Sequence, residues 1–262
     1  MSFIEKNIDG VVYMTSPNIE TTHAFTTRIG GVSTDIYATM NLGLNLTDDH
    51  EHVKENYRII CRTLGITEDS IVFSNQIHGA NVRLVTREDC GALYEGSEYE
   101  SDALITCDEG VALTVFVGDC VPILLHDPVR RAVGAIHAGW RGTAKDISGA
   151  TVRKMVTEFD CSPADIRAAI GPSISKCCYE TDRDVAAAMK DQLQEDADTC
   201  VTYRNKKYMV DLKESNRLQL HRAGVNEIMI SDECTFCLSE KYWSHRITKG
   251  RRGSQAGIII IN

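Results

Sequence analysis

Cys120 and His137 are the residues whose types and spacing most directly suggest chemistry. They flank two strand-like runs joined by residues 127–130, Asp-Pro-Val-Arg, a turn with proline at its second position. If His126 pairs with Arg131, Cys120 lies directly opposite His137, with Cβ atoms roughly 5 Å apart. A thiol and an imidazole at that distance can share a zinc ion, or act as a nucleophile and its base. The sequence therefore predicts a metal or thiol site at this end of a hairpin.

His78 is the candidate third ligand, because it ends an apolar run just before Gly79. Two imidazoles and one thiolate leave the fourth tetrahedral position open, which is the arrangement of a catalytic zinc. The alternative is a small buried cysteine with two hydrogen-bonded histidines, and spacing alone does not decide between them.

A second candidate site follows His137, where Thr143 and Asp146 have the spacing of a capping box. This spacing predicts a helix from about residue 143 to 159, with Arg141 just before its N-terminus. Free amide groups, the helix dipole and a guanidinium would bind phosphate there. The alternative is a capped helix with an exposed arginine.

The cysteines outside this region give weaker signals. Cys234-Thr-Phe-Cys237 has redox or half-zinc spacing, but no second pair with suitable spacing lies nearby in the sequence. The adjacent Cys177 and Cys178 are expected to be packing residues.

The elements that must position these groups alternate between strands and helices. We expect helices at 48–64, 143–159, 182–193 and 212–223, and strands at 70–77, 81–86, 111–137 (the hairpin), 227–231 and 257–261. Hairpin-linked strands mixed with helices indicate an α+β layered fold. Pro122 lacks a backbone donor, which predicts an edge or irregular strand near Cys120.

Composition limits the class of protein. The 262 residues carry a net charge of -9 and are 43% hydrophobic, which argues against broad binding to nucleic acids or membrane surfaces. We find no membrane-span-length apolar run and no signal-peptide core, and ten cysteines then indicate the reducing cytoplasm. No linker or repeat is evident, so we expect one domain over residues 1–262. The oligomeric state is not set by the sequence.

Eight motifs in this order resemble a known family: Phe25-Thr-Thr-Arg28-Ile-Gly-Gly-Val-Ser33, Asn41-Leu-Gly43, Gln76-Ile-His78-Gly79, Asp102-Ala-Leu, Asp119-Cys120-Val-Pro122, His137-Ala-Gly-Trp-Arg-Gly142, Ile170-Gly-Pro-Ser-Ile174 and Ser244-His-Arg246. The chain resembles the YfiH-type laccase-domain proteins, also called purine nucleoside phosphorylase or peptidoglycan editing factor proteins. The resemblance runs from about Phe25 to the C-terminus. Two departures are Gly118, where the family usually has alanine, and a more basic tail after Arg246.

The resemblance implies a four-layer α/β/β/α sandwich shared with a necrotising-factor toxin domain, and zinc on His78, Cys120 and His137. It also implies phosphorolysis of adenosine, inosine, guanosine and methylthioadenosine, with adenosine deamination as a second activity. The partners would then be purine nucleosides and phosphate. Copper oxidation is not expected, because a multicopper oxidase needs several H-x-H pairs and this chain has only one, at 50–52.

Residue roles follow as expectations. Asp119 is the candidate proton shuttle for deamination, although in a regular strand it would point away from Cys120. Arg141, helped by Arg28, would bind phosphate, and Asn41 and Arg246 would bind substrate.

Two other functions stay open. One is a hydrolase with Cys120 as nucleophile and His137 as base, acting on cell-wall precursor amides. The other is a non-catalytic regulator that binds zinc or nucleotides.

Overall fold

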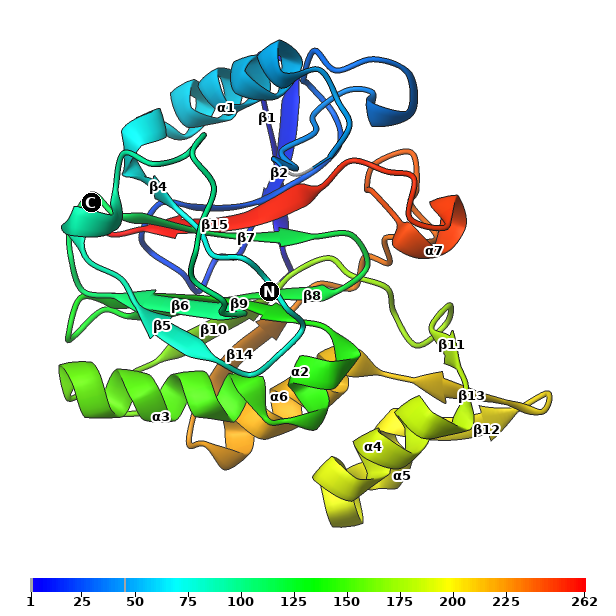
Figure 1. The fold of residues 1–262 in the computed structure, drawn as a ribbon. Helices are drawn as coiled ribbons and strands as arrows, with labels where there is room; N and C mark the ends of the chain where they lie inside the picture. The colour runs from blue at the N-terminus through cyan, green and yellow to red at the C-terminus, as the bar shows by residue number, and fades with distance from the viewer. Residues whose placement is uncertain (1, 45) are drawn as a thin grey trace.

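Two six-stranded sheets lie face to face, and helices cover their outer sides in the computed structural model, which describes residues 2–44 and 46–262 (Figure 1). The first sheet has the order β1 (Ile4–Ile8), β2 (Val11–Thr15), β3 (His23–Thr26), β15 (Gln255–Ile260), β7 (Ala112–Val117) and β4 (Ile71–Val72). The second has the order β14 (Glu227–Ile230), β10 (Arg167–Ile170), β8 (Val121–Asp127), β9 (Ala132–Ala138), β6 (Ala103–Thr106) and β5 (Val82–Leu84). A small third sheet has the order β11 (Glu180–Thr181), β13 (Lys207–Val210) and β12 (Val201–Arg204).

The helices are short except for four. The α-helices are α1 (His50–Leu64), α2 (Trp140–Ala144), α3 (Ile147–Phe159), α4 (Arg183–Leu193), α5 (Ala197–Cys200), α6 (Leu212–Arg222) and α7 (His245–Thr248). The 3₁₀ helices are η1 (Asp35–Tyr37), η2 (Glu68–Ser70), η3 (Arg87–Asp89) and η4 (Gln194–Asp196). Among the described residues, no helix has the length and apolar character needed to cross a membrane.

Strand alternation explains the layers. In β8, Leu124 packs between the two sheets, whereas Ile123 and Leu125 face α3 and α6. In β15, Ile259 packs between the sheets while Ile258 faces α1. Because both central strands bury both faces, the fold is the α/β/β/α sandwich that the resemblance implied.

The turn that holds Cys120 is a crossing between the sheets. Strand β7 belongs to the first sheet and β8 to the second, so residues 118–120 carry the chain from one to the other. Asp119 has a φ of 87° there, in the left-handed region, so the strand is not regular at this point.

The hairpin of β8 and β9 forms, but its predicted register is wrong by two residues. Pro122, not Cys120, faces His137, and the loop spans 128–131 because Asp127 pairs with Ala132. A two-residue shift keeps every side chain on its face, so Cys120 remains a diagonal neighbour of His137.

Of the two alternatives predicted from Pro122, the edge strand is wrong, because β8 lies between β10 and β9, whereas the irregular strand is confirmed by the left-handed φ of Asp119 beside Cys120. The last pair of β8 with β10 is Ile123 with Ile170, so Pro122 sits beyond that ladder, where its carbonyl accepts a hydrogen bond from Gly171. The missing donor is therefore tolerated at the end of an interior pairing.

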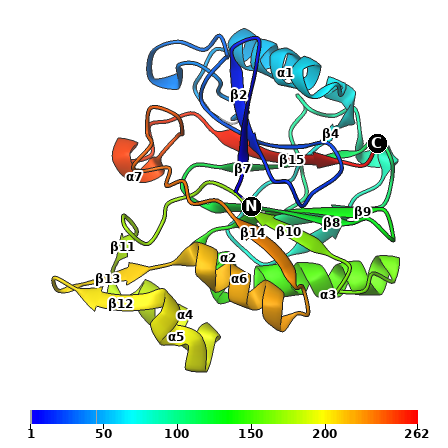
Figure 2. The same ribbon diagram turned by 180° about the vertical axis from the view of Figure 1, so that it is seen from behind.

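The third sheet and α4 extend to one side of the sandwich, as both views show (Figures 1 and 2). Met189 of α4 and Val210 of β13 nevertheless belong to the same apolar cluster as Met155 of α3. Because this unit shares its core with the second sheet, we propose that residues 1–262 form one domain.

Candidate metal centre and pocket

His78, Cys120 and His137 converge at one end of the space between the sheets. Their ligand atoms all lie within 4.8 Å of one another, and the Cys120 sulfur is 4.0 Å from Nε2 of His78. The rings of His78 and His137 meet edge to face with centroids 4.8 Å apart. Two ring nitrogens and one sulfur thus lie close enough together to bind one metal ion.

Asp102 orients this group, and the motif analysis gave it no role. Its Oδ1 lies 2.8 Å from Nδ1 of His137 and accepts a 2.9 Å bond from the amide of His78, while Oδ2 accepts one of 2.6 Å from the Gly79 amide. Burial alone would raise the pKa of Asp102, but His137 and these amides lower it, so the carboxylate is ionised. Nδ1 of His137 therefore carries the proton and Nε2 is free to bind a metal.

Gln76 and Gly139 shape the same centre. The side-chain amide of Gln76 pairs with both backbone groups of Phe116 in β7, with bonds of 2.7 and 2.8 Å, which fixes the loop that carries His78. A Cβ on Gly139 would lie 3.0 Å from His78 and 3.3 Å from the sulfur of Cys120. A side chain there would crowd the ligands, which explains glycine between His137 and α2.

The metal-free electrostatics favour a charged pair. Burial alone would raise the pKa of the Cys120 thiol, but His137 and His78 lower it to about 6. Burial would lower the pKa of His137, but Cys120 and Asp102 raise it to about 9. The thiolate form that metals and electrophiles both require is therefore favoured at neutral pH.

Two hollows meet at the centre. The larger has a volume of about 390 Å³ and is lined by His78, Gly118, Asp119, Cys120, Trp140, Arg141, Ile174, Tyr179, Leu212, His245, Arg246 and Arg252. The smaller, about 220 Å³, shares His78, Gly118, Cys120 and Arg252 and adds residues of the 43–46 and 73–76 segments. A volume near 390 Å³ falls in the range of small-molecule sites.

Arg141 lines the larger hollow, but the helix geometry predicted for it is wrong. The chain forms two helices, α2 from Trp140 and α3 from Ile147, and Asp146 between them is left-handed with a φ of 60°. Thr143 is buried inside α2 and its hydroxyl donates to the carbonyl of Gly139, so no capping box forms. Arg141 is thus the second residue of the five-residue helix α2, and not the residue before the 143–159 helix, and its guanidinium lies 4.4 Å from the ring centre of Trp140.

Two further guanidinium groups face the larger hollow. Arg246 donates from its side chain to Glu180 and lies 5.4 Å from the ring of Tyr179. Arg252 is mostly buried, and its Nε has no hydrogen-bond partner among the described residues. A Cβ on Gly118 would lie only 2.2 Å from the central carbon of that guanidinium, so the glycine at this position makes room for Arg252.

The structure contradicts the substrate-binding roles expected for Arg28 and Asn41. Arg28 donates to the carbonyls of Ala38 and Ser239 and stacks 4.0 Å over Trp243. Asn41 is fully buried, donating to Asp48 and accepting from two backbone amides. Neither side chain lines the two hollows, because both are used to hold loops together.

Asp119 reaches the larger hollow in a different role from the one predicted. Its two oxygens accept hydrogen bonds from Thr235 (2.6 Å), Ser244 (3.0 Å) and the amide of Arg246 (2.7 Å). Both oxygens of Asp119 are therefore engaged by donors from three different residues. The contacts instead favour a positioning role for the turn beside Cys120 and the start of α7.

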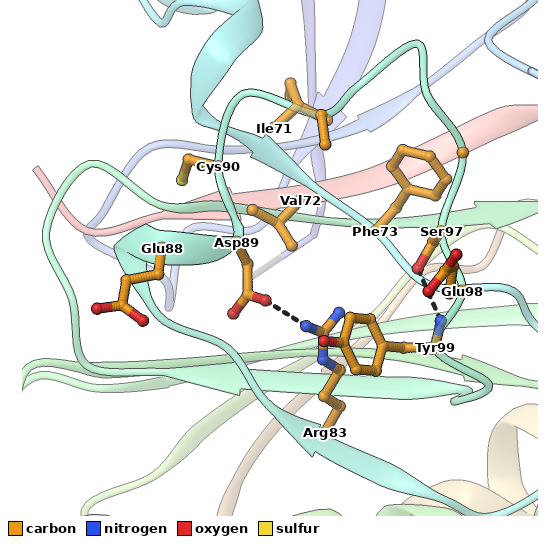
Figure 3. Close-up of a pocket in the computed structure, with 12 residues that line it drawn as sticks. Ile71, Val72, Phe73, Arg83, Glu88, Asp89, Cys90, Ser97, Glu98 and Tyr99 are labelled. Carbon is orange, nitrogen blue, oxygen red and sulfur yellow. Dashed lines mark hydrogen bonds and ion pairs between the residues drawn. The ribbon is translucent and has the colours of Figure 1, made fainter.

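A separate hollow of about 270 Å³ lies beside the 83–99 segment (Figure 3). Arg83 is ion-paired with Asp89 there, and its guanidinium lies 3.4 Å from the ring centre of Tyr99. Arg83 and Asp89 are thus paired with each other, and we assign no chemistry to this hollow.

Comparisons with known proteins identify the family of this chain. A family model described as "Multi-copper polyphenol oxidoreductase laccase" matches residues 22–262. The chain belongs to this family.

The laccase-domain relatives are similar over their whole length. Purine nucleoside phosphorylase YlmD of Geobacillus stearothermophilus is 37% identical over 245 residues, 89% of this chain and 88% of that protein. A purine nucleoside phosphorylase of Deinococcus radiodurans is 36% identical over 250 residues, covering 95% and 93%. The crystal structure of the Bacillus licheniformis hypothetical protein YfiH is 32% identical, covers 98% of this chain and 99% of its own, and superposes with a TM-score of 0.92. The resemblance to the YfiH-type family and the predicted fold are thereby confirmed.

Proposed function

We propose that this protein is a zinc-dependent purine nucleoside phosphorylase that accepts adenosine, inosine, guanosine and methylthioadenosine, with adenosine deaminase activity in addition. The observation that carries the proposal is the juxtaposition of the His78–Cys120–His137 group with three guanidinium groups around one hollow. Relatives named purine nucleoside phosphorylase, similar along nearly all of the chain, support the same reaction.

The donor set fits zinc. Two imidazoles and one thiolate are ligands that zinc prefers, and Asp102 fixes the tautomer of His137 as a partner outside the ligand shell. Bound to His78, Cys120 and His137, zinc would supply Lewis-acid chemistry at the floor of the hollow. A copper oxidase would need many more clustered histidines, and among the described residues only His78 and His137 belong to a metal-capable group.

The arginines suit the phosphate co-substrate. Arg141, Arg246 and Arg252 line one hollow and bring three positive charges to it. Phosphate held by such donors would be oriented toward the ribose C1′, and their charge would balance the charge that develops as the purine leaves. Tyr179 and Trp140, in the wall of the same hollow, offer aromatic surface for the base.

A matched set of variants tests the proposal. Purified protein with quantified zinc is given each nucleoside with and without phosphate, and adenine, hypoxanthine, guanine and ribose 1-phosphate are measured. We expect phosphate-dependent products from wild type, none from Cys120→Ala, and loss of phosphorolysis in Arg141→Ala with its zinc content unchanged. Arg28→Lys is the control outside the pocket. Untouched nucleosides in zinc-loaded wild type would end the purine proposal.

One observation favours a second candidate, a thiol hydrolase acting on cell-wall precursor amides. Cys120, His137 and Asp102 form a thiolate, imidazole and carboxylate series in the metal-free chain. Chelators separate the two functions: removing zinc would abolish a zinc enzyme's activity but would activate a Cys-His hydrolase. A regulator without catalysis would bind a nucleoside tightly and release no product.

A further inference from the structure

Four cysteines from two distant loops converge beside the larger hollow. Cys177 and Cys178 lie between β10 and β11, and Cys234 and Cys237 follow β14. All four sulfur atoms lie within 4.8 Å of one another. Cys177 and Cys178 thus supply in space the second pair that the sequence does not show near Cys234 and Cys237.

The spacing of the sulfurs matches a particular chemistry. Cys178 and Cys237 are 3.4 Å apart, Cys177 and Cys178 3.5 Å, and Cys177 and Cys237 3.8 Å. Four thiolates around zinc at about 2.3 Å place their sulfurs about 3.8 Å apart in a tetrahedron. A disulfide would need about 2.05 Å, and all four cysteines are free thiols.

We propose that Cys177, Cys178, Cys234 and Cys237 bind a structural zinc ion, separate from the His78–Cys120–His137 centre. The sulfurs enclose the volume of a single ion and leave no room for a multi-iron cluster. Four thiolates fill a tetrahedral shell completely, so this ion would have no open position and no part in catalysis.

The surroundings provide for the negative charge of such a site. The amide of Ser175 donates to the sulfur of Cys234 at 3.4 Å. Lys213 of α6 is buried, and its ammonium group donates to the carbonyls of Ser231 and Glu233 just before Cys234. A buried cation beside a cluster of thiols is stabilised when those thiols are ionised, as zinc requires.

The ion would fasten two loops that build the catalytic hollow. The 171–179 loop supplies Ile174 and Tyr179 to its wall, and Thr235 donates to Asp119 in the turn beside Cys120. The two loops also meet directly, through a short parallel bridge between Ser173 and Cys234. A metal crosslink at this point would hold the wall in place relative to the catalytic turn.

Zinc content measured by mass spectrometry tests the site, on full-length protein loaded with zinc under reductant and then desalted. We expect two zinc ions per chain in wild type and in Cys107→Ser, a control thiol outside both groups. Cys120→Ser should keep one, and the Cys234→Ser, Cys237→Ser double variant should keep the other. The proposal is overturned if the double variant binds as much zinc as wild type, whereas loss of zinc from Cys120→Ser bears only on the catalytic centre.

A second measurement covers the case in which the double variant does not fold. Cobalt(II) replaces zinc in Cys120→Ser, in which the four-cysteine group is the one metal-capable group of the described residues that still offers thiolates. We expect strong sulfur-to-cobalt charge-transfer absorption and protection of four thiols from alkylation until a chelator is added. Four thiols that alkylate at once in metal-loaded protein, or that form disulfides under reductant, would refute the zinc site.

Discussion

Asp102 gives the sharpest test of the metal centre, because one carboxylate serves three donors. In Asp102→Asn, one oxygen is replaced by an NH₂ group of nearly the same shape. If the remaining oxygen takes the Oδ1 position, the NH₂ faces the amide of Gly79; if it takes the Oδ2 position, the NH₂ faces Nδ1 of His137 and the amide of His78. In either orientation at least one buried donor faces another donor.

These contacts set the expected loss of zinc affinity and of folding stability in Asp102→Asn. Loss of a carboxylate that orients a zinc-bound histidine costs about 10- to 100-fold in metal affinity. That range corresponds to roughly 1.4–2.7 kcal/mol. An unpaired buried donor costs a further ~1–3 kcal/mol in folding free energy. We therefore expect Asp102→Asn to fold, to melt at lower temperature, and to need 10- to 100-fold more free zinc for half-maximal activity.

The assay titrates phosphorolysis against free zinc set by a chelator buffer, so that only the catalytic ion is read out. Asp127→Asn is the matched control, since Asp127 is as buried as Asp102, lies in the β8–β9 hairpin that carries His137, and accepts from the amides of Val129 and Arg130 through Oδ1. It should shift the melting temperature but leave the zinc titration unchanged. Equal zinc requirements for wild type and Asp102→Asn would refute the orienting role, as would an Asp127→Asn shift of the same size.

Three other predictions address the pocket and the fold. Arg252→Ala should raise the KM for phosphate about tenfold or more, because it removes a hydrogen bond between a charged group and the phosphate. Gly118→Ala should also raise this KM, because its side chain would displace the guanidinium of Arg252. Steady-state kinetics at varied phosphate measures both, and an unchanged KM in both variants would remove Arg252 from the phosphate site. Arg28→Ala should cost on the order of 2 kcal/mol in urea unfolding and leave the KM values unchanged, because its guanidinium binds only loop carbonyls and Trp243. Burial lowers the pKa of His23, so the folded protein disfavours the protonated ring. The free energy of unfolding is therefore unaffected by this group above about pH 6.5 and falls as the pH drops below that value, by at most ~1.4 kcal/mol per pH unit. The unfolding free energy of His23→Gln should therefore fall less between pH 6.5 and 5 than that of wild type or of the exposed-site control His221→Gln, and equal slopes would contradict it.

Local sequence patterns predicted a helix well where capping residues mark its two ends. Helix α1 begins after Asp49, whose side chain accepts from the amide of Glu51, and ends at Gly65 in the left-handed conformation. Its buried face is formed by Val53, Tyr57 and Ile60, at helical spacing. The caps and the apolar stripe act within one turn of the chain, so the sequence alone contains them.

In other segments, tertiary contacts determine the secondary structure and override the local sequence pattern. The 143–159 helix is broken at Asp146 so that Arg141 and Thr143 form a separate turn of helix against the hollow. Of the predicted strand at 70–77, Ile71 and Val72 pair with β7 and Asn75 makes an isolated parallel bridge with Glu100, because the residues after Val72 leave the sheet to carry His78 to the metal centre. In both places a regular element gives way where a functional side chain must be aimed.

The same reasoning explains which site residues the sequence revealed. His78, Cys120 and His137 were recognisable because metal ligands are few and chemically distinct. The arginines were not, since a guanidinium's use depends on what packs beside it: Arg28 meets loop carbonyls, whereas Arg252 reaches the hollow only because Gly118 has no side chain. Arginine roles were therefore set by loop packing that no spacing rule describes.

The four-cysteine group shows most clearly what sequence spacing cannot predict. Its two halves are 59 residues apart where Cys178 meets Cys237, with the third sheet, α4 and α6 between them. Spacing rules for zinc sites apply to pairs within a short loop, and Cys234 and Cys237 have the spacing of such a pair. The other half is a pair of adjacent cysteines, which bind one ion together only when the backbone turns both sulfurs to the same side. That turn is closed by hydrogen bonds from the amides of Cys178 and Tyr179 to the carbonyl of Ser175, and the bridge between Ser173 and Cys234 joins the two loops. The fold that the ion would stabilise is therefore also what brings its ligands together.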